Sequence, residues 1–128
     1  MKCLYKDFNP LDFLEIAKKL LLIDDLDEKA KFRTSIGRAY YSAFLLTRTR
    51  LERNKGINFG KEKQHKEVRD SLKLIGMDYM ADQLKTLFDY RTNADYYLAV
   101  SVNKSINDSL CNKCIIIAEQ VIEEIEDI

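Results

Sequence analysis

A chain of 128 residues is long enough to bury a hydrophobic core and is most simply a single domain spanning residues 1–128. Hydrophobic residues make up 46% and charged residues 33% of the chain, a globular balance that argues against intrinsic disorder. Lysine plus arginine and aspartate plus glutamate each number 21, so the net charge is zero and any nucleic-acid binding must be local.

No segment of the sequence predicts a membrane span or a secretion signal. The apolar run Leu20–Ile23 is far too short for a membrane-spanning helix, which needs about 20 residues. The N-terminal stretch MKCLYKDFNPLDFLE has early acidic residues and no small-residue cleavage site. Three cysteines in a chain without a secretion signal indicate reduced thiols, so we expect a cytoplasmic protein.

Helix-start residues mark the first two predicted helices. Asn9 suits an N-cap and Pro10 the first helical position, so a helix is expected from there to about Leu22. Asp25 and Glu28 have the spacing of a capping box, which predicts the start of a second helix.

The second helix is expected to be long, from about Leu26 to Asn54, and to end at Gly56. Its apolar residues recur at spacings of three and four, which is one helical face. The members of this face are Phe32, Ile36, Ala39, Ala43 and Leu46, widened by Tyr40, Phe44 and Leu51. At 1.5 Å per residue this helix would be about 40 Å long and would span the whole domain.

Three shorter helices complete the prediction, at about 63–75, 78–93 and 105–127. The segment LAVSVNKS between the last two suggests a brief extended link, and no alternating strand pattern is convincing. About five helices with short loops pack most economically as an all-α, antiparallel up-and-down bundle with one long central helix.

An ion pair interrupts the apolar stripe of the fourth predicted helix. Leu84, Leu87 and Phe88 form the stripe, and Arg91 and then Asp95 follow at successive turns. Three tyrosines surround this pair: Tyr90, Tyr96 and Tyr97. A stripe-facing arginine needs a carboxylate, a phosphate or access to water. The pair therefore either fixes helix packing, lies exposed without a role, or forms an anion-binding cleft with Arg91 as the phosphate ligand and the tyrosines beside it.

The second helix also carries a candidate interface. Arg38, Tyr41, Leu45 and Arg48 lie opposite the apolar face, and such a mixture is typical of a surface that binds a partner helix. The alternative is that Tyr41 and Leu45 contact another helix of the same bundle.

The only histidine, His65, lies in a basic segment. From residue 48 to residue 70 there are eight lysines or arginines and four acids, and this excess, which includes Lys63 and Lys66, could bind RNA phosphates. The alternative is a solvated face. His65 has the side chain best suited to proton transfer near neutral pH, but it gains a functional interpretation only if its helix brings it near Arg91.

Other motifs of chemical interest are weak or missing from the sequence. Cys111 and Cys114 provide half of a zinc site at most, and packing explains them better, so we expect no metal and no cofactor. There is no glycine-rich phosphate loop, nucleophile elbow or paired Glu-x-x-His motif, which argues against nucleotide-hydrolysing and di-iron enzymes.

Two motifs together make the chain resemble the HEPN domain family, in particular its small stand-alone prokaryotic members. They are FRTSIGRAYYSAF in the long helix and YRTNADYY before the last helix, with Arg91, Ala94, Asp95 and Tyr96 as the most specific string. The resemblance implies a helical bundle that forms a homodimer and works on RNA or nucleotides. It also implies a toxin–antitoxin or defence-like role, because many members are metal-independent ribonucleases or toxins encoded beside a nucleotidyltransferase partner.

The ribonuclease members of the family carry a histidine that is separated from the arginine by four to six intervening residues, and this chain does not. The corresponding positions hold Tyr96, Tyr97 and Leu98, and a tyrosine is a poor base at neutral pH. Our first hypothesis is therefore a dimer that binds RNA, a nucleotide or a protein partner near Arg91. The rival is a ribonuclease with a rebuilt site of Arg91, His65, Asp95 and Tyr96, and the third option is a purely structural assembly module.

Overall fold

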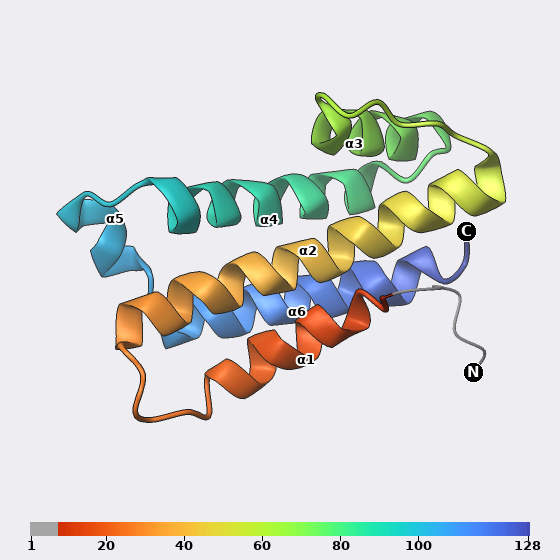
Figure 1. Cartoon of the computed structure of the whole chain (residues 1–128). Coiled ribbons are helices and arrows are strands. Elements are labelled where there is room, and N and C mark those ends of the chain that lie inside the picture. Colours follow the sequence, from red (N-terminus) through yellow and green to blue (C-terminus); the bar gives the residue numbers. More distant parts are fainter. Residues whose placement is uncertain (1–7) are drawn as a thin grey trace.

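The computed structural model describes residues 8–128 of the chain, and residues 1–7, which include Cys3 and the start of the stretch searched for a secretion signal, lie outside this range. Six helices and no strand occur within the described residues (Figure 1). They are α1 (Leu11–Leu20), α2 (Glu28–Lys55), α3 (Gln64–Leu74), α4 (Asp78–Tyr96), α5 (Val100–Ser105) and α6 (Asp108–Ile125). The predicted all-α bundle with one long helix is confirmed, with one helix more than expected.

The ends of α1 and α2 follow from local capping. The side chain of Asn9 accepts a hydrogen bond of 3.0 Å from the backbone of Leu11, but the cap residue of α1 is Pro10 and the helix begins at Leu11, one residue later than predicted. The cap of α2 is Asp27, whose carboxylate accepts 2.8 Å from the N–H of Ala30, so the predicted capping box at Asp25 is wrong. Gly56 ends α2 in the left-handed conformation, with φ of 66°, which glycine adopts without strain.

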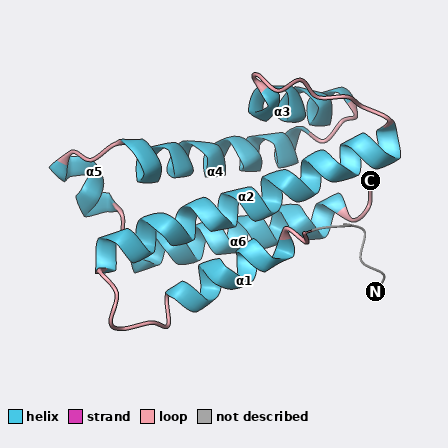
Figure 2. Cartoon of the chain, viewed as in Figure 1, coloured by secondary structure: helices cyan, strands magenta, loops and turns pink. Residues whose placement is uncertain are grey.

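The core of the bundle surrounds α2, which packs against α1, α4 and α6 (Figure 2). Its 28 residues correspond to about 42 Å, so it runs the length of the domain. The apolar face predicted from spacing is buried, including Ile36 and Ala43, which are fully inaccessible. Burial of such side chains, worth about 1.5–3 kcal/mol for each large one, is the main source of stability.

The segment after α4 differs from the prediction. Instead of an extended link, residues Val100–Ser105 form the short helix α5. Arg33 of α2 binds this segment: its guanidinium donates to the carbonyls of Ala94 and Tyr97 at 2.7 and 3.1 Å and to Asn103 Oδ1 at 3.2 Å. Only the bond to Asn103 reaches α5 itself, and Val102 of α5 packs against the core. A six-residue helix is too short to be stable alone, so it depends on such tertiary contacts.

Helix α3 lies against α4 at one end of the bundle, beside the second half of α2 (Figure 1). Val68 and Leu72 on α3 are fully buried and anchor it. Every helix within residues 8–128 is too short or too polar to cross a membrane.

Candidate phosphate-binding site

Arg91 is buried at the border between α4 and α2. Its residue exposure is 6%, and its Nη1 lies 3.5 Å from Oδ2 of Asp95, whose side chain is 39% exposed. Nε of Arg91 is buried and has no hydrogen-bond partner within the described residues. Gly37 of α2 borders this pair, and a Cβ at that position would lie 3.7 Å from Oδ1 of Asp95, an ordinary van der Waals contact. A guanidinium that is removed from water and only partly paired has donors to spare for an anion.

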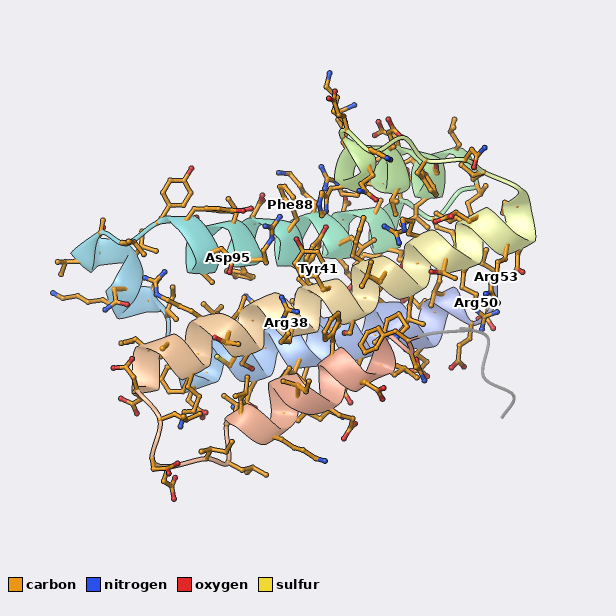
Figure 3. The ribbon with its side chains drawn as sticks, viewed as in Figure 1. Arg38, Tyr41, Arg50, Arg53, Phe88 and Asp95 are labelled. Atoms are coloured by element: carbon orange, nitrogen blue, oxygen red, sulfur yellow. The ribbon has the colours of Figure 1, made fainter. Side chains whose placement is uncertain are left out.

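Four aromatic rings surround the guanidinium of Arg91. Its Cζ lies 5.1 Å from the ring centroid of Phe88, 5.4 Å from that of Tyr41 and 5.5 Å from that of Tyr40. The exposed ring of Tyr96 is the fourth, at 5.9 Å. Figure 3 shows Tyr41 on α2, with Phe88 and Asp95 on α4, along the border between the two helices. Ring faces attract the cation, so the rings partly replace the water that Arg91 has lost.

His65 of α3 joins the same aromatic cluster. Its Nδ1 and the hydroxyl of Tyr40 share a hydrogen bond of 2.5 Å, and its ring stacks on Phe44 with centroids 4.4 Å apart. The centroid of His65 lies 5.3 Å from that of Phe88, the ring that also contacts Arg91. The ring centroid of His65 therefore lies within about 10.4 Å of Cζ of Arg91, on the same aromatic cluster.

Positive charge dominates the surroundings of His65. Burial lowers the pKa of His65 below its ordinary value of 6.5, and the charges of Arg91, Arg69 and Arg48 lower it further. Burial also raises the pKa of Tyr40 far above its ordinary value, although Arg91 and Arg69 oppose this. Both groups are thus neutral at pH 7, and the net charge beside them comes from arginines.

Arg69 and Arg48 extend this positive region on either side. The Cζ of Arg69 lies 4.9 Å from the ring centroid of Phe88, and its Nη1 is buried without a hydrogen-bond partner within residues 8–128. Arg48 has a nearby acid and a hydrogen-bond partner: its Nε lies 3.1 Å from Oε1 of Glu52 without hydrogen-bond geometry, and its Nη1 donates 2.8 Å to Oε1 of Gln64, at the edge of an open hollow of about 240 Å³. Arg69 is therefore the better second candidate for an anion.

We use the name Arg91 site for Arg91, Asp95, His65, Tyr40, Tyr41, Phe88, Tyr96 and Arg69. The structure thus brings together all four residues of the predicted rebuilt site, Arg91, His65, Asp95 and Tyr96. Sequence reasoning did not include Tyr40 or Arg69, because Tyr40 reads as part of the core face of α2 and Arg69 as one more charge in a basic segment.

Other predicted ligand residues lie elsewhere. The hydroxyl of Tyr90 accepts a hydrogen bond of 3.1 Å from Nζ of Lys113 on α6, which directs that ring away from Arg91. Tyr97 is exposed, Lys63 is exposed just before α3, and Lys66 forms an exposed pair with Asp70 at 2.9 Å. None of these side chains has a contact with Arg91 within the described residues.

The predicted interface residues of α2 have contacts inside the chain. Cζ of Arg38 lies 4.6 Å from the ring centroid of Phe13 on α1, and Tyr41 and Leu45 are half-buried against the core. Arg48 holds the pairs described above. Contacts within the chain therefore bury part of each of these side chains, and the part that stays accessible is available to a partner.

The two cysteines of α6, Cys111 and Cys114, are fully buried, as expected for packing residues. Within residues 8–128 no cluster of three or more histidine, cysteine, aspartate or glutamate side chains is arranged to hold a metal ion.

Comparison with known proteins points to one family. Residues 11–128 match the family described as the HEPN domain. A curated relative, the uncharacterized protein MJ0628 of Methanocaldococcus jannaschii, is 36% identical over 108 residues, which cover 71% of this chain and 64% of the relative. The chain thus spans somewhat less than two thirds of that relative's length. No solved structure matches the chain significantly.

Proposed function

Because the chain belongs to the HEPN domain family, a family of helical modules related to nucleotides and RNA, we propose that it binds RNA or nucleotide phosphate at the Arg91 site. The observation that supports this most is the state of Arg91: 6% exposed, with a single carboxylate at 3.5 Å and a buried Nε without a partner in the described chain. A phosphate offers the additional acceptors that such a guanidinium lacks.

The surroundings of Arg91 fit a nucleic-acid ligand better than a free carboxylate. Exposed Tyr96 and half-buried Tyr41 provide ring faces within 5.9 Å of the guanidinium, and bases stack on such rings. Arg69, across Phe88, provides a second cation for a neighbouring phosphate. Asp95 opposes the ligand, because its carboxylate competes for Arg91 and repels phosphate.

The test is the affinity for a fluorescently labelled single-stranded RNA, measured by anisotropy. We expect Arg91→Met to weaken binding about tenfold or more, since one charge-assisted contact is worth about 1.5–3 kcal/mol. Asp95→Asn should bind RNA more tightly than the wild type. A matched control is Lys19→Met, which removes an exposed charge from α1, far from the site in sequence and on another helix. Equal affinities for the Arg91 and Lys19 variants would refute the proposal.

A second candidate function is a metal-independent ribonuclease, and the shared position of His65 and Arg91 beside Phe88 favours it. In this reaction the ribose 2′-oxygen forms a bond to phosphorus while the bond to the 5′-oxygen breaks. His65 would take the 2′-hydroxyl proton, and Arg91 would stabilise the charge on phosphorus. A water molecule would protonate the leaving 5′-oxygen, and the hydroxide so formed would take the proton from His65. RNA cleavage in EDTA that leaves 2′,3′-cyclic phosphate ends and is lost in His65→Ala would support this candidate.

Assembly forms part of the same proposal. We place a homodimer contact on the exposed parts of Arg38, Tyr41, Leu45 and Arg48, and we expect a nucleotidyltransferase as the protein partner, in a cytoplasmic toxin–antitoxin or defence-like system. Light scattering of the purified protein tests the first point: a dimer that dissociates in Leu45→Glu supports it, and a wild-type monomer contradicts it.

A further inference from the structure

The hydrogen bond between Tyr40 and His65 determines which nitrogen of His65 carries its proton. A neutral imidazole has one N–H donor and one bare acceptor nitrogen, and the partner of either nitrogen selects the tautomer. Here the partner is the hydroxyl of Tyr40, 2.5 Å from Nδ1. A hydroxyl can donate or accept, so the direction of this bond follows from what else surrounds the two groups.

The phenol of Tyr40 has no other acceptor. The residue is 1% exposed, and within residues 8–128 its hydroxyl has no hydrogen-bond partner except His65. If Nδ1–H donated to this oxygen, the phenolic hydrogen would remain buried without an acceptor, at a cost of about 1–3 kcal/mol. If the phenol donates to Nδ1, both groups are satisfied, and the remaining proton of His65 is on Nε2.

We infer that Tyr40 is a positioning residue, which donates its O–H to Nδ1 of His65 and thereby holds His65 as the neutral Nε2–H tautomer. His65 is half-buried, and its Nε2 has no partner within the described residues, so the Nε2–H group is left to water or to a ligand. It then presents a neutral hydrogen-bond donor on the same aromatic cluster as the Arg91 guanidinium, and such a donor suits a phosphate oxygen. The role in ligand binding rests on the proposed function, whereas the tautomer does not.

The tautomer also decides between the two candidate functions. A general base needs a bare nitrogen within reach of the 2′-hydroxyl, but Nδ1 is occupied by Tyr40 and Nε2 already carries a proton. The charged groups that face His65 reinforce the neutral form: Arg91 from α4, Arg69 from α3 and Arg48 from α2. In this arrangement His65 binds phosphate and does not accept a proton from RNA.

The experiment is nitrogen NMR of the ¹⁵N-labelled protein, which is simple to interpret because the chain has one histidine, provided that any affinity tag is removed. At pH 7 without ligand we expect long-range proton–nitrogen correlations of an unprotonated Nδ1 and a protonated Nε2. In Tyr40→Phe we expect a mixture of tautomers and a higher histidine pKa. Tyr41→Phe is the matched control, because its ring lies 6.2 Å from that of His65 without a hydrogen bond, and it should leave the spectrum unchanged.

A protonated Nδ1 in the wild type, or a spectrum that Tyr40→Phe does not alter, would overturn the inference. If Tyr40→Phe fails to fold, the wild-type spectrum alone decides. Adding a short single-stranded oligouridylate then separates the two claims. A shift of Nε2 with its proton retained supports the donor role, and a shift with the proton lost overturns it. An unperturbed Nε2 overturns the donor role as well, and only the absence of any RNA binding, seen by anisotropy, would count against the proposed function itself.

Discussion

Replacing Arg91 with methionine separates a role in folding from a role in binding. At about 4 Å an ion pair gains about 4 kcal/mol at an effective dielectric constant of 20, while removing each ion from water costs several kcal/mol. For Arg91, 6% exposed and 3.5 Å from Asp95, these terms nearly cancel. Methionine fills similar space and keeps sulfur–aromatic contacts, worth about 0.3–1.5 kcal/mol, in place of cation–π contacts of about 0.5–2 kcal/mol. We therefore expect the free energy of unfolding of Arg91→Met to lie within about 1 kcal/mol of the wild-type value.

Removing the carboxylate instead should be worse for stability. Asp95→Asn leaves the Arg91 cation buried without its acid, a change that costs about 3–5 kcal/mol in fully buried pairs. The side chain of Asp95 is 39% exposed, so water screens part of the effect, and we expect a loss of about 1–2 kcal/mol. The predicted order of stability is therefore wild type about equal to Arg91→Met, with Asp95→Asn below both.

Urea denaturation followed by far-ultraviolet circular dichroism measures these differences, provided that the m-values agree among the three proteins. The reasoning would be refuted if Arg91→Met lost more than about 3 kcal/mol while Asp95→Asn lost none, because Arg91 would then be a packing residue with no need of an anion.

Three further predictions concern other groups. Arg33→Met should destabilise the end of α4 and α5 by about 2 kcal/mol, through loss of charged hydrogen bonds to carbonyls, and hydrogen exchange there should accelerate. Because the pKa of His65 is lower in the folded protein than in the unfolded chain, the unfolded chain binds that proton first as pH falls. The free energy of unfolding should therefore decrease as pH drops below 6.5. Urea titrations at several pH values should show a smaller decrease for His65→Gln than for the wild type. Burial raises the pKa of Cys111 to about 11 and of Cys114 to about 12, so peptide mapping should find both unalkylated by iodoacetamide at pH 7 until the protein unfolds.

Helical periodicity and end signals account for most of the fold that could be predicted. The apolar spacing from Phe32 to Leu46 and the glycine stop at residue 56 identify α2, since both act within one helix. Two features of the fold could not be predicted from the sequence. Asp25 and Asp27 both suit an N-cap, and only the folded loop selects Asp27. Helix α5 depends on tertiary contacts, such as the bond from Arg33 to Asn103 and the packing of Val102 on the core, which no local pattern contains.

Only the part of the candidate site that depends on sequence neighbours within one helix could be predicted from the sequence. Arg91 could be singled out because a charge interrupts an apolar stripe, which is a local signal along α4. The Tyr40–His65 bond joins residues 25 positions apart on different helices, so it depends on how α3 returns to the bundle. A buried tyrosine on a core face looks like packing until its hydroxyl partner is known.

The salt dependence of RNA binding tests most directly the claim that Arg91 contacts phosphate. Each phosphate contact to a single strand releases counterions and contributes about 0.7 to the slope of log affinity against log salt concentration. We predict that Arg91→Met reduces the slope by about 0.7 relative to the wild type and that Lys19→Met leaves it unchanged. A wild-type slope retained in Arg91→Met would contradict the account.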